Sequence, residues 1–531
     1  MFDPSSPRTA VRVFPDAALA ARPRLFAALA DAFPVAFEPG AEAGGRRPPA
    51  AELHFAPTDH FATRPAPAPG GLALVLGEAP WSGALTEQVE FGDEVDRRLS
   101  GLLVSDPLDG PELDLEPGEA VLARSGRRPV WSRAAGEATV ERVVSTLPEL
   151  GPEQSLRELL FERPVATIAL ISFLRAACGE ELAAAPPLRA AFVFDDPNLR
   201  WRSYGYIDYG RLLLHAEEHG YHAAMAMIPL DARRQHRGTV DLFRAHPDRL
   251  SLVMHGNNHL SRELLRLDDE SAALAMAAQA MRRADAFEAR HCLRMDRVMM
   301  PPHGMCSGAS AAALAAVGFD ALCAIHPLPW AERPPADRPL AGLDPAEFSA
   351  GCAVIPRLPL GVAAAELALR AFLGQPLVVY GHHGDLAGGL DPLAEAAAAI
   401  NDLGDVIWCS LGEIAGSNAA TRLDGGLLRV RPFSHRLLLS LPAGAAAITV
   451  EAPRDEAARF GGWSPDGGPA RRFGEPVEVG EEQIAAIRLH PGGAIDPDAV
   501  ASPAPSIWPL VRRTATETRD RLQPLLGSGA R

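Results

Sequence analysis

Two adjacent carboxylates, Asp195 and Asp196, end a short apolar stretch of the chain that is typical of a buried strand. The stretch covers residues 190–194, and Pro197 follows the two acids. Carboxylates at this spacing repel each other unless a cation or a shared proton lies between them. Asp and Pro are also common turn residues, so the pair by itself indicates a strand-ending turn. The polar residues that follow later strands decide between the two interpretations.

Histidines follow three later apolar stretches of the same region. His255 and His259 come after the third stretch, His303 after the fourth, and His382 and His383 after the seventh. The carboxyl ends of parallel strands lie at one edge of a sheet, where functional groups gather. We therefore expect these imidazoles to share one rim with the two carboxylates, as a metal-assisted hydrolase requires.

The spacing of His255 and His259 predicts a metal site. Residues four apart lie on one face of a helical turn, so both rings could reach one cation. One Asp oxygen would complete a three-ligand site with an open position for water. Zinc is the metal that we expect first with these ligands, although other divalent first-row metals also fit. His215 and His219 have the same spacing. We interpret that pair as structural, because it lies late in a predicted helix at the opposite rim and no acid follows it.

Apolar stretches alternate with amphipathic segments from residue 188 to residue 417. Repeated strand–helix units imply a parallel sheet, and seven or eight of them predict an α/β fold with an irregular (β/α)7-8 barrel. An open doubly wound sheet is the alternative. Within this region, residues 262–290 predict one long helix and residues 327–348 a long loop. The flanking segments are predicted as an N-terminal α/β module of unknown function (1–150), a helical connector (151–187), a small β-sandwich (418–500), and a linker with a terminal helix (501–531).

Composition restricts the classes of partner. The formal net charge of −16 argues against nucleic acid, because phosphate binding needs a basic face. No apolar stretch is long enough to span a membrane, and the first residues do not resemble a signal peptide, so we expect a cytoplasmic protein. The six cysteines are scattered without a CxxC pair, which is typical of reduced thiols. The sequence does not indicate an oligomeric state.

The residues at the strand ends resemble the motifs of the polysaccharide deacetylase family over residues 188–417. The resemblance rests on Phe194-Asp195-Asp196, His255-x-x-x-His259, the Pro301-Pro302-x-Gly304 turn and a late strand that ends in His. Members of this family are metal-dependent carbohydrate esterases with an irregular (β/α) barrel. The resemblance implies Asp195 as general base, Asp196, His255 and His259 as metal ligands, and His382 or His383 as general acid, with His382 preferred.

Three positions depart from the family pattern. Gly256 stands where the family usually has Ser or Thr. Met300 stands where it has an Arg that orients the catalytic Asp, and Arg297 is a candidate to replace that Arg. His303 stands where it has a Tyr, and the backbone N–H of His303 could still stabilise an oxyanion.

The combined prediction is a metal-dependent amide hydrolase that removes an N-acetyl group from an amino sugar or glycan. Water activated by the metal would attack the carbonyl, and Asp195 would accept its proton. The alternative, which Met300 favours, is a catalytically impaired barrel that binds carbohydrate or a protein partner. A glycoside hydrolase is a third hypothesis, but it needs two opposed carboxylates and no metal, which leaves His255 and His259 unexplained.

Overall fold

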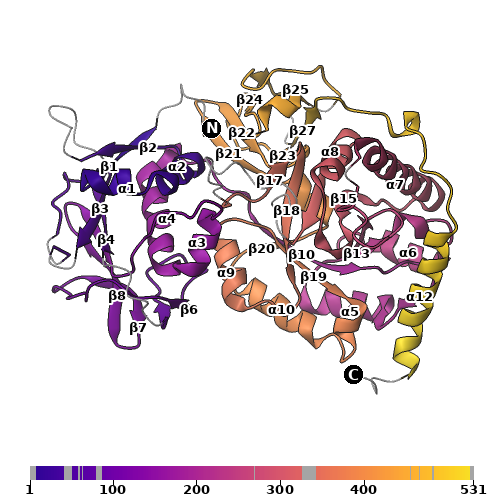
Figure 1. The fold of residues 1–531 in the computed structure, drawn as a ribbon, viewed down its shortest axis with the longest axis horizontal. Coiled ribbons are helices and arrows are strands. Elements are labelled where there is room, and N and C mark those ends of the chain that lie inside the picture. Colours follow the sequence, from indigo (N-terminus) through magenta and orange to yellow (C-terminus); the bar gives the residue numbers. More distant parts are fainter. Residues whose placement is uncertain are drawn as a thin grey trace. The chain divides into compact units, whose positions relative to one another are not determined.

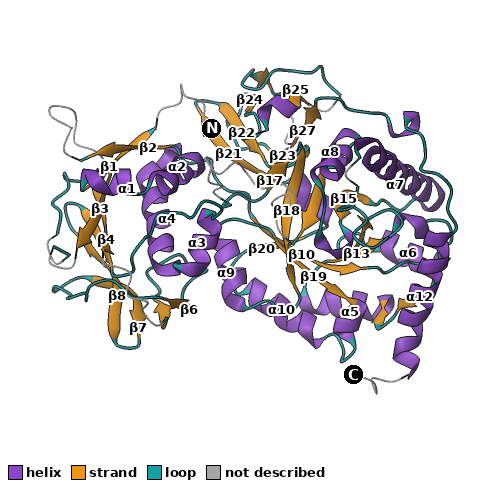
Figure 2. Ribbon diagram, in the orientation of Figure 1, coloured by secondary structure: helices purple, strands orange, loops and turns teal. Residues whose placement is uncertain are grey.

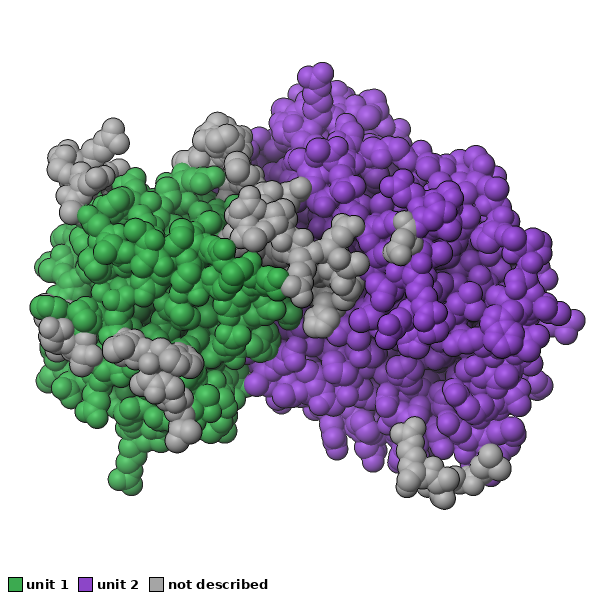
Figure 3. Space-filling view, viewed as in Figure 1, with its two compact units in different colours: residues 1–183, 334–344 green, residues 184–333, 345–531 purple. Residues whose placement is uncertain are grey.

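The chain folds into two compact units, residues 1–183 with 334–344 and residues 184–333 with 345–531 (Figure 3). The structure is a computed structural model, and no helix among its described residues is long and apolar enough to cross a membrane. The described residues are 8–40, 51–57, 60–61, 64–78, 86–267, 269–325, 342–454, 456–465, 467–480 and 484–526.

The first unit is built around one nine-stranded mixed sheet with the order β2-β1-β3-β4-β9-β8-β7-β5-β6 (Figure 1). The pairings from β2 to β9 are parallel, and those from β9 to β6 are antiparallel. The strands are β1 (Thr9–Phe14), β2 (Val35–Pro39), β3 (Ala51–Pro57), β4 (Leu72–Glu78), β5 (Glu87–Phe91), β6 (Leu103–Asp106), β7 (Ala120–Ser125), β8 (Arg128–Ala135) and β9 (Thr139–Val143).

Helices accompany this sheet, and the start of one is specified locally. The Ser155 side chain accepts the N–H of Glu158, and the Glu158 carboxylate accepts the N–H of Ser155, so a capping box begins α3. The following helix α4 is buried along most of its length, as its mainly apolar sequence requires. The helices are α1 (Asp16–Ala21), α2 (Pro23–Ala32), α3 (Leu156–Glu162), α4 (Pro164–Cys178) and the 3-10 turn η1 (Gly179–Glu181).

Seven parallel strands close into a barrel in the second unit (Figures 1 and 2). Closure is seen at β10, where Phe192 lies opposite Ala223 of β13 on one side and opposite Val379 of β19 on the other. The predicted (β/α) barrel is thereby confirmed, and the open-sheet alternative is wrong. Around the barrel the strands are β10 (Leu188–Asp195), β13 (Ala223–Met227), β14 (Leu250–His255), β15 (Asp296–Met300), β16 (Ala321–Ala324), β18 (Cys352–Pro359) and β19 (Leu377–His382).

Alternation along the strands decides which side chains enter the barrel. Phe192 and Phe194 pack in the apolar core between strands and helices, so Val193 and Asp195 point inward. Burial of each such aromatic ring stabilises the fold by about 2 kcal/mol. The surrounding helices are α5 (Tyr209–His219), α6 (Arg237–Ala245), α7 (Glu270–His291), α8 (Gly308–Ala316), α9 (Ala364–Phe372), α10 (Asp391–Asn401) and α11 (Leu411–Gly416), with 3-10 turns η2 (Pro229–Asp231), η3 (Pro302–Gly304) and η4 (His383–Leu386).

One helix of the barrel unit begins later than predicted, whereas the number of barrel strands is within the predicted seven or eight. The eighth strand, β20 (Val406–Trp408), pairs only with the first residues of β10, so the barrel has seven strands. The helix expected from residue 262 begins at Glu270, because the Asp269 side chain caps its N-terminus and residues 262–267 form turns. Most of the predicted loop 327–348 lies outside the described residues. The short strands β11 (Ser203–Tyr204) and β12 (Ile207–Asp208) pair with each other, and β17 (Glu347–Ser349) pairs antiparallel with β18.

Two small sheets follow the barrel and share one apolar core around Val430, Leu437 and Trp463. The first has the order β21-β22-β24-β26 and the second β23-β27-β25. Their strands are β21 (Ala419–Asp424), β22 (Leu427–Pro432), β23 (Arg436–Ser440), β24 (Ala447–Val450), β25 (Phe460–Pro465), β26 (Val477–Glu478) and β27 (Ile484–Pro491), with the 3-10 turn η5 (Ala457–Arg459) between β24 and β25.

The chain then returns to the barrel. After the turn η6 (Pro497–Ala499), the helix α12 (Trp508–Leu526) lies beside the barrel, near α6 in Figure 1. Its buried residues Arg513, Glu517 and Asp520 are four and three apart, so they form one polar face. A buried polar face on a terminal helix needs partners, and these come from the rim that carries the predicted site.

Candidate metal centre

Three predicted ligands meet at one rim of the barrel. Asp196 follows β10, His255 ends β14, and His259 lies four residues further on, with one ligand atom from each within 4.8 Å of the others. The Nε2 atom of His259 lies 3.2 Å from Oδ1 of Asp196. A carboxylate and two imidazoles at this separation suit a zinc-like ion with an open coordination position.

The loop after β14 brings the two histidines together without the expected helical turn. The backbone N–H groups of Asn257, Asn258 and His259 all donate to the buried carboxylate of Glu263, which wraps the loop around that side chain. Gly256 has φ +61°, and a Cβ atom there would lie 2.6 Å from the Glu263 carboxylate and 2.7 Å from Pro302. The space therefore requires glycine at position 256, where the resembled family has Ser or Thr.

The donor atoms of this cluster fit a metal ion. Asp196 Oδ1 is buried and accepts no hydrogen bond from the described residues, which is a costly state without a cation. His255 Nδ1 lies 3.0 Å from the carbonyl oxygen of Met300; since that oxygen can only accept, Nδ1 carries the proton and Nε2 is left as the ligand atom. Asp196 and His259 have φ of +84° and +55°, strained values for non-glycine residues that cluster at functional sites.

Electrostatics keep His259 and Asp196 in the protonation states that bind metal. Burial lowers the pKa of His259 to about 4, so its ring is neutral at pH 7. Burial opposes ionisation of Asp196, but the neighbouring His259, His255 and Arg513 outweigh it and hold the pKa of Asp196 below its ordinary value. A neutral imidazole and an ionised carboxylate are the ligand states that a divalent ion requires.

Asp195 is paired with an arginine that sequence reasoning missed. Nη1 of Arg357, on β18, donates to both carboxylate oxygens of Asp195 at 3.1 and 3.0 Å, and both side chains are almost fully buried. The guanidinium also lies over the ring of Tyr380, 4.1 Å from its centroid. Arg297, the candidate named from sequence, instead pairs with Glu288 and Asp285. A charged residue within the apolar strand 352–359 is the sequence signal that could have identified Arg357.

The two late histidines are separated by the alternation of β19. His382 lies opposite Asp195 in the parallel register of β10 and β19, so both side chains are on the same face of the sheet. The His382 ring is exposed and accepts the backbone N–H of Asp385. His383 is buried on the other face, where its ring stacks on Tyr206 and its Nε2 lies 3.7 Å from Asp520. The register thus places His382, and not His383, beside Asp195.

His303 lies near the cluster, with its ring centroid 6.1 Å from that of His259. It adopts φ +62° within the turn Pro302–Gly304. Pro302 has no N–H, and the N–H of Gly304 donates to Pro301, so the amide of His303 is the candidate oxyanion donor of this turn.

Side chains of helix α12 contact Asp196 and residues next to it, which the sequence did not predict. Arg513 donates to the backbone oxygen of Asp196 at 2.8 Å and to the carboxylate of the fully buried Asp231 at 2.8 Å. Tyr204 donates to Asp520 at 2.9 Å. Burial alone would raise the pKa of Asp520, but the nearby His383 and the hydrogen bonds from Arg519 and Tyr204 lower it to about 2. The hydrogen bond from Arg513 helps to hold Asp196 in its positive-φ conformation.

The second pair of histidines with this spacing does not belong to the cluster. His215 and His219 lie at the end of α5 with ring centroids 4.3 Å apart, and His215 Nδ1 is 2.9 Å from the hydroxyl of Tyr221. No described carboxylate joins them in a cluster suited to a metal. The same four-residue spacing therefore gives a candidate metal site at one rim and a packed pair at the other.

The protein contains a closed (β/α) barrel with a His-His-Asp cluster at the carboxyl ends of its strands. It therefore belongs to the class of barrels with a candidate metal-dependent site. No family model and no curated protein matches the chain. Solved structures resemble part of it at low identity.

Three of these structures illustrate the likeness. A Mycobacterium smegmatis protein described as a polysaccharide deacetylase is 17% identical, with a TM-score of 0.32, over 44% of this chain and 93% of that one. A family 4 carbohydrate esterase from Streptomyces lividans is 16% identical, with a TM-score of 0.27, over 46% and 100%. A Streptococcus mutans esterase is 15% identical, with a TM-score of 0.26, over 44% and 94%. At these identities and TM-scores, we rest the proposed function on the geometry of the site.

Proposed function

We propose that this protein is a metal-dependent hydrolase that removes an N-acetyl group from an amino sugar or glycan. The observation that carries the proposal is the convergence of Asp196, His255 and His259 beside the buried pair of Asp195 and Arg357. A divalent ion bound there, with zinc the first expectation, would supply Lewis acidity toward an amide carbonyl and toward water.

The side chains around the ligands have the roles that amide hydrolysis needs. Asp195 accepts the proton of the attacking water, while Arg357 compensates the charge of this buried carboxylate and fixes its orientation. The N–H of His303 donates to the developing oxyanion. His382, on the same face of the sheet as Asp195, donates a proton to the departing nitrogen. His383 has a positioning role through its contact with Asp520.

The catalytically impaired alternative was drawn from Met300, which leaves no arginine at the family position. Arg357 contacts Asp195 from another strand, so Met300 no longer favours that alternative. Turnover by the metal-loaded protein distinguishes the two functions: acetate release supports the hydrolase, and stable sugar binding without acetate release supports the binding protein.

A matched pair of histidine variants tests the proposal. His259→Ala removes one ligand from the cluster, whereas His215→Ala removes a histidine of the same i,i+4 spacing from α5. We expect His259→Ala to lose stoichiometric zinc, measured by elemental analysis, and to lose acetate release from an N-acetylglucosamine oligomer. We expect His215→Ala to keep both. Full zinc occupancy and activity in His259→Ala would refute the assigned centre.

A further inference from the structure

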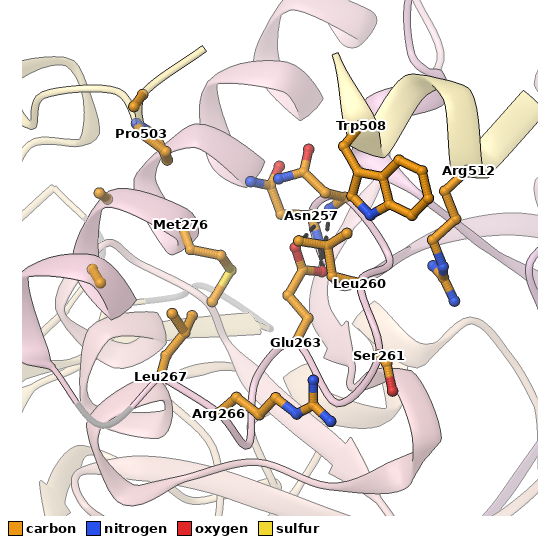
Figure 4. Close-up of a pocket in the computed structure, with 14 residues that line it drawn as sticks. Asn257, Leu260, Ser261, Glu263, Arg266, Leu267, Met276, Pro503, Trp508 and Arg512 are labelled. Atoms are coloured by element: carbon orange, nitrogen blue, oxygen red, sulfur yellow. Dashed lines mark hydrogen bonds between the residues drawn. The ribbon is translucent and has the colours of Figure 1, made fainter. Parts of the chain in front are cut away.

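An open pocket of about 690 Å³ lies on the other side of the loop that carries His259. Its walls come from residues 257–267, from the first turns of α7, and from the first turns of α12 with the segment that leads into it (Figure 4). A volume in this range is typical of sites for small organic molecules. None of the proposed catalytic residues or metal ligands lines it, so hydrolysis does not account for it.

The pocket has an apolar end and a cationic end. In Figure 4, Met276, Leu267 and Pro503 lie on one side, and Arg512, Ser261 and the guanidinium of Arg266 lie toward the other. The exposed apolar surface of this pocket would favour an apolar group of a ligand, because its burial removes that surface from water.

Two further polar groups of the wall, on Glu263 and Asn257, are already bonded within the protein. Glu263 accepts three backbone N–H groups of its own loop, and the side-chain amide of Asn257 donates to Gln279. Arg266 is exposed and has no carboxylate within ion-pair distance among the described residues. Arg512 donates to the backbone oxygen of His259. The ligand that this wall can recognise therefore has a negative head at the arginines and an apolar body.

We propose that this pocket binds an amphipathic anion, an apolar chain that ends in a carboxylate or a phosphate. The chain lies against Met276, Leu267 and Pro503, and the head group faces Arg266 and Arg512. Arg512 also contacts His259, so the head group lies at the end of the pocket nearest the metal cluster. The binding site is separate from the catalytic proposal, and its test does not require turnover.

Calorimetric titration of the full-length protein with dodecanoate, below its micelle concentration, tests the proposal. We expect saturable one-to-one binding, and weaker binding of dodecanol, which lacks the charge. Arg266→Gln should weaken dodecanoate binding about tenfold, which corresponds to 1.4 kcal/mol. Arg237→Gln is the matched control, because Arg237 on α6 is a surface arginine whose side chain is 96% exposed. It should leave the affinity unchanged.

Ala275→Phe places a ring inside the pocket from α7 and should abolish binding; Ala272→Phe serves if the first variant does not fold. Three results would overturn the proposal. The parent protein does not bind dodecanoate, Arg266→Gln binds it with the affinity of the parent, or a folded Ala275→Phe or Ala272→Phe variant binds it as well as the parent. Cosedimentation with phosphatidylglycerol vesicles distinguishes two sources of the anion. Cosedimentation that Arg266→Gln abolishes assigns a membrane lipid, whereas dodecanoate binding without cosedimentation assigns a free amphiphile.

Discussion

Replacement of Arg357 by methionine removes the positive charge that faces Asp195 while keeping a long apolar side chain. The two side chains are 1% and 3% exposed, and Nη1 lies 3.1 and 3.0 Å from the carboxylate oxygens. Removal of one partner of a buried pair leaves an uncompensated charge, which costs about 3–5 kcal/mol. We therefore expect Arg357→Met to lose about 4 kcal/mol of unfolding free energy and about 100-fold in kcat/KM for deacetylation.

A double variant separates the pair interaction from loss of packing. Asp195→Asn together with Arg357→Met removes both charges, so the double variant should lose about 2 kcal/mol less unfolding free energy than the two single variants lose in sum, without recovery of activity. Urea denaturation and acetate release measure the two quantities.

Arg297→Met is the matched control for Arg357→Met. Arg297 pairs with Glu288 and Asp285 where all three side chains are partly exposed, so its loss should cost about 1 kcal/mol or less and leave activity unchanged. If Arg357→Met keeps both its unfolding free energy and its kcat/KM, Arg357 is not the partner of a catalytic carboxylate.

Two further predictions concern α12 and the pH dependence of stability. Arg513→Met removes the donor to the backbone of Asp196, so zinc affinity in a competition titration should fall about tenfold; unchanged affinity would exclude a role for α12 in the site. Burial raises the pKa of Asp296 from 3.8 to about 6, so its ionisation in the folded state destabilises the protein as pH rises from about 4 to 6, by at most about 3 kcal/mol. Asp296→Asn, which can still accept the N–H of Gly412, should therefore raise the Tm at pH 8 and not at pH 4, and an equal change at both would contradict this.

Local sequence rules predicted the parts of the fold that depend on neighbouring residues. The fully buried strand Leu188–Asp195 is an apolar run stopped by charge, and the capping box at Ser155 starts α3 as its residue types require. The helix expected from residue 262 was wrong at its start. Asp269 is a local N-cap signal, but the amphipathic pattern begins before it, so the pattern predicted a helix start that is too early.

The sequence predicts part of the arrangement of the candidate site, because parallel strands place their carboxyl ends at one rim. This geometry predicted that Asp196, His255 and His259 lie together, although the turn that joins the histidines is held by Glu263 and is not helical. Which of His382 and His383 shares the face of Asp195 depends on the strand register, which sequence does not specify when two histidines are adjacent.

By itself, the sequence determined the alternating strands and helices of a parallel sheet and the rim on which its carboxylates and imidazoles gather, because both follow from short-range periodicity; closure into a barrel was seen only in the strand pairing. Only the tertiary structure decided which charges face each other across the barrel. Arg357 reaches Asp195 from a strand that is 162 positions away, and Arg513 reaches Asp196 from 317 positions away. Pairings at such separations are set by the closure of the sheet and the return of the chain, and no local pattern encodes them.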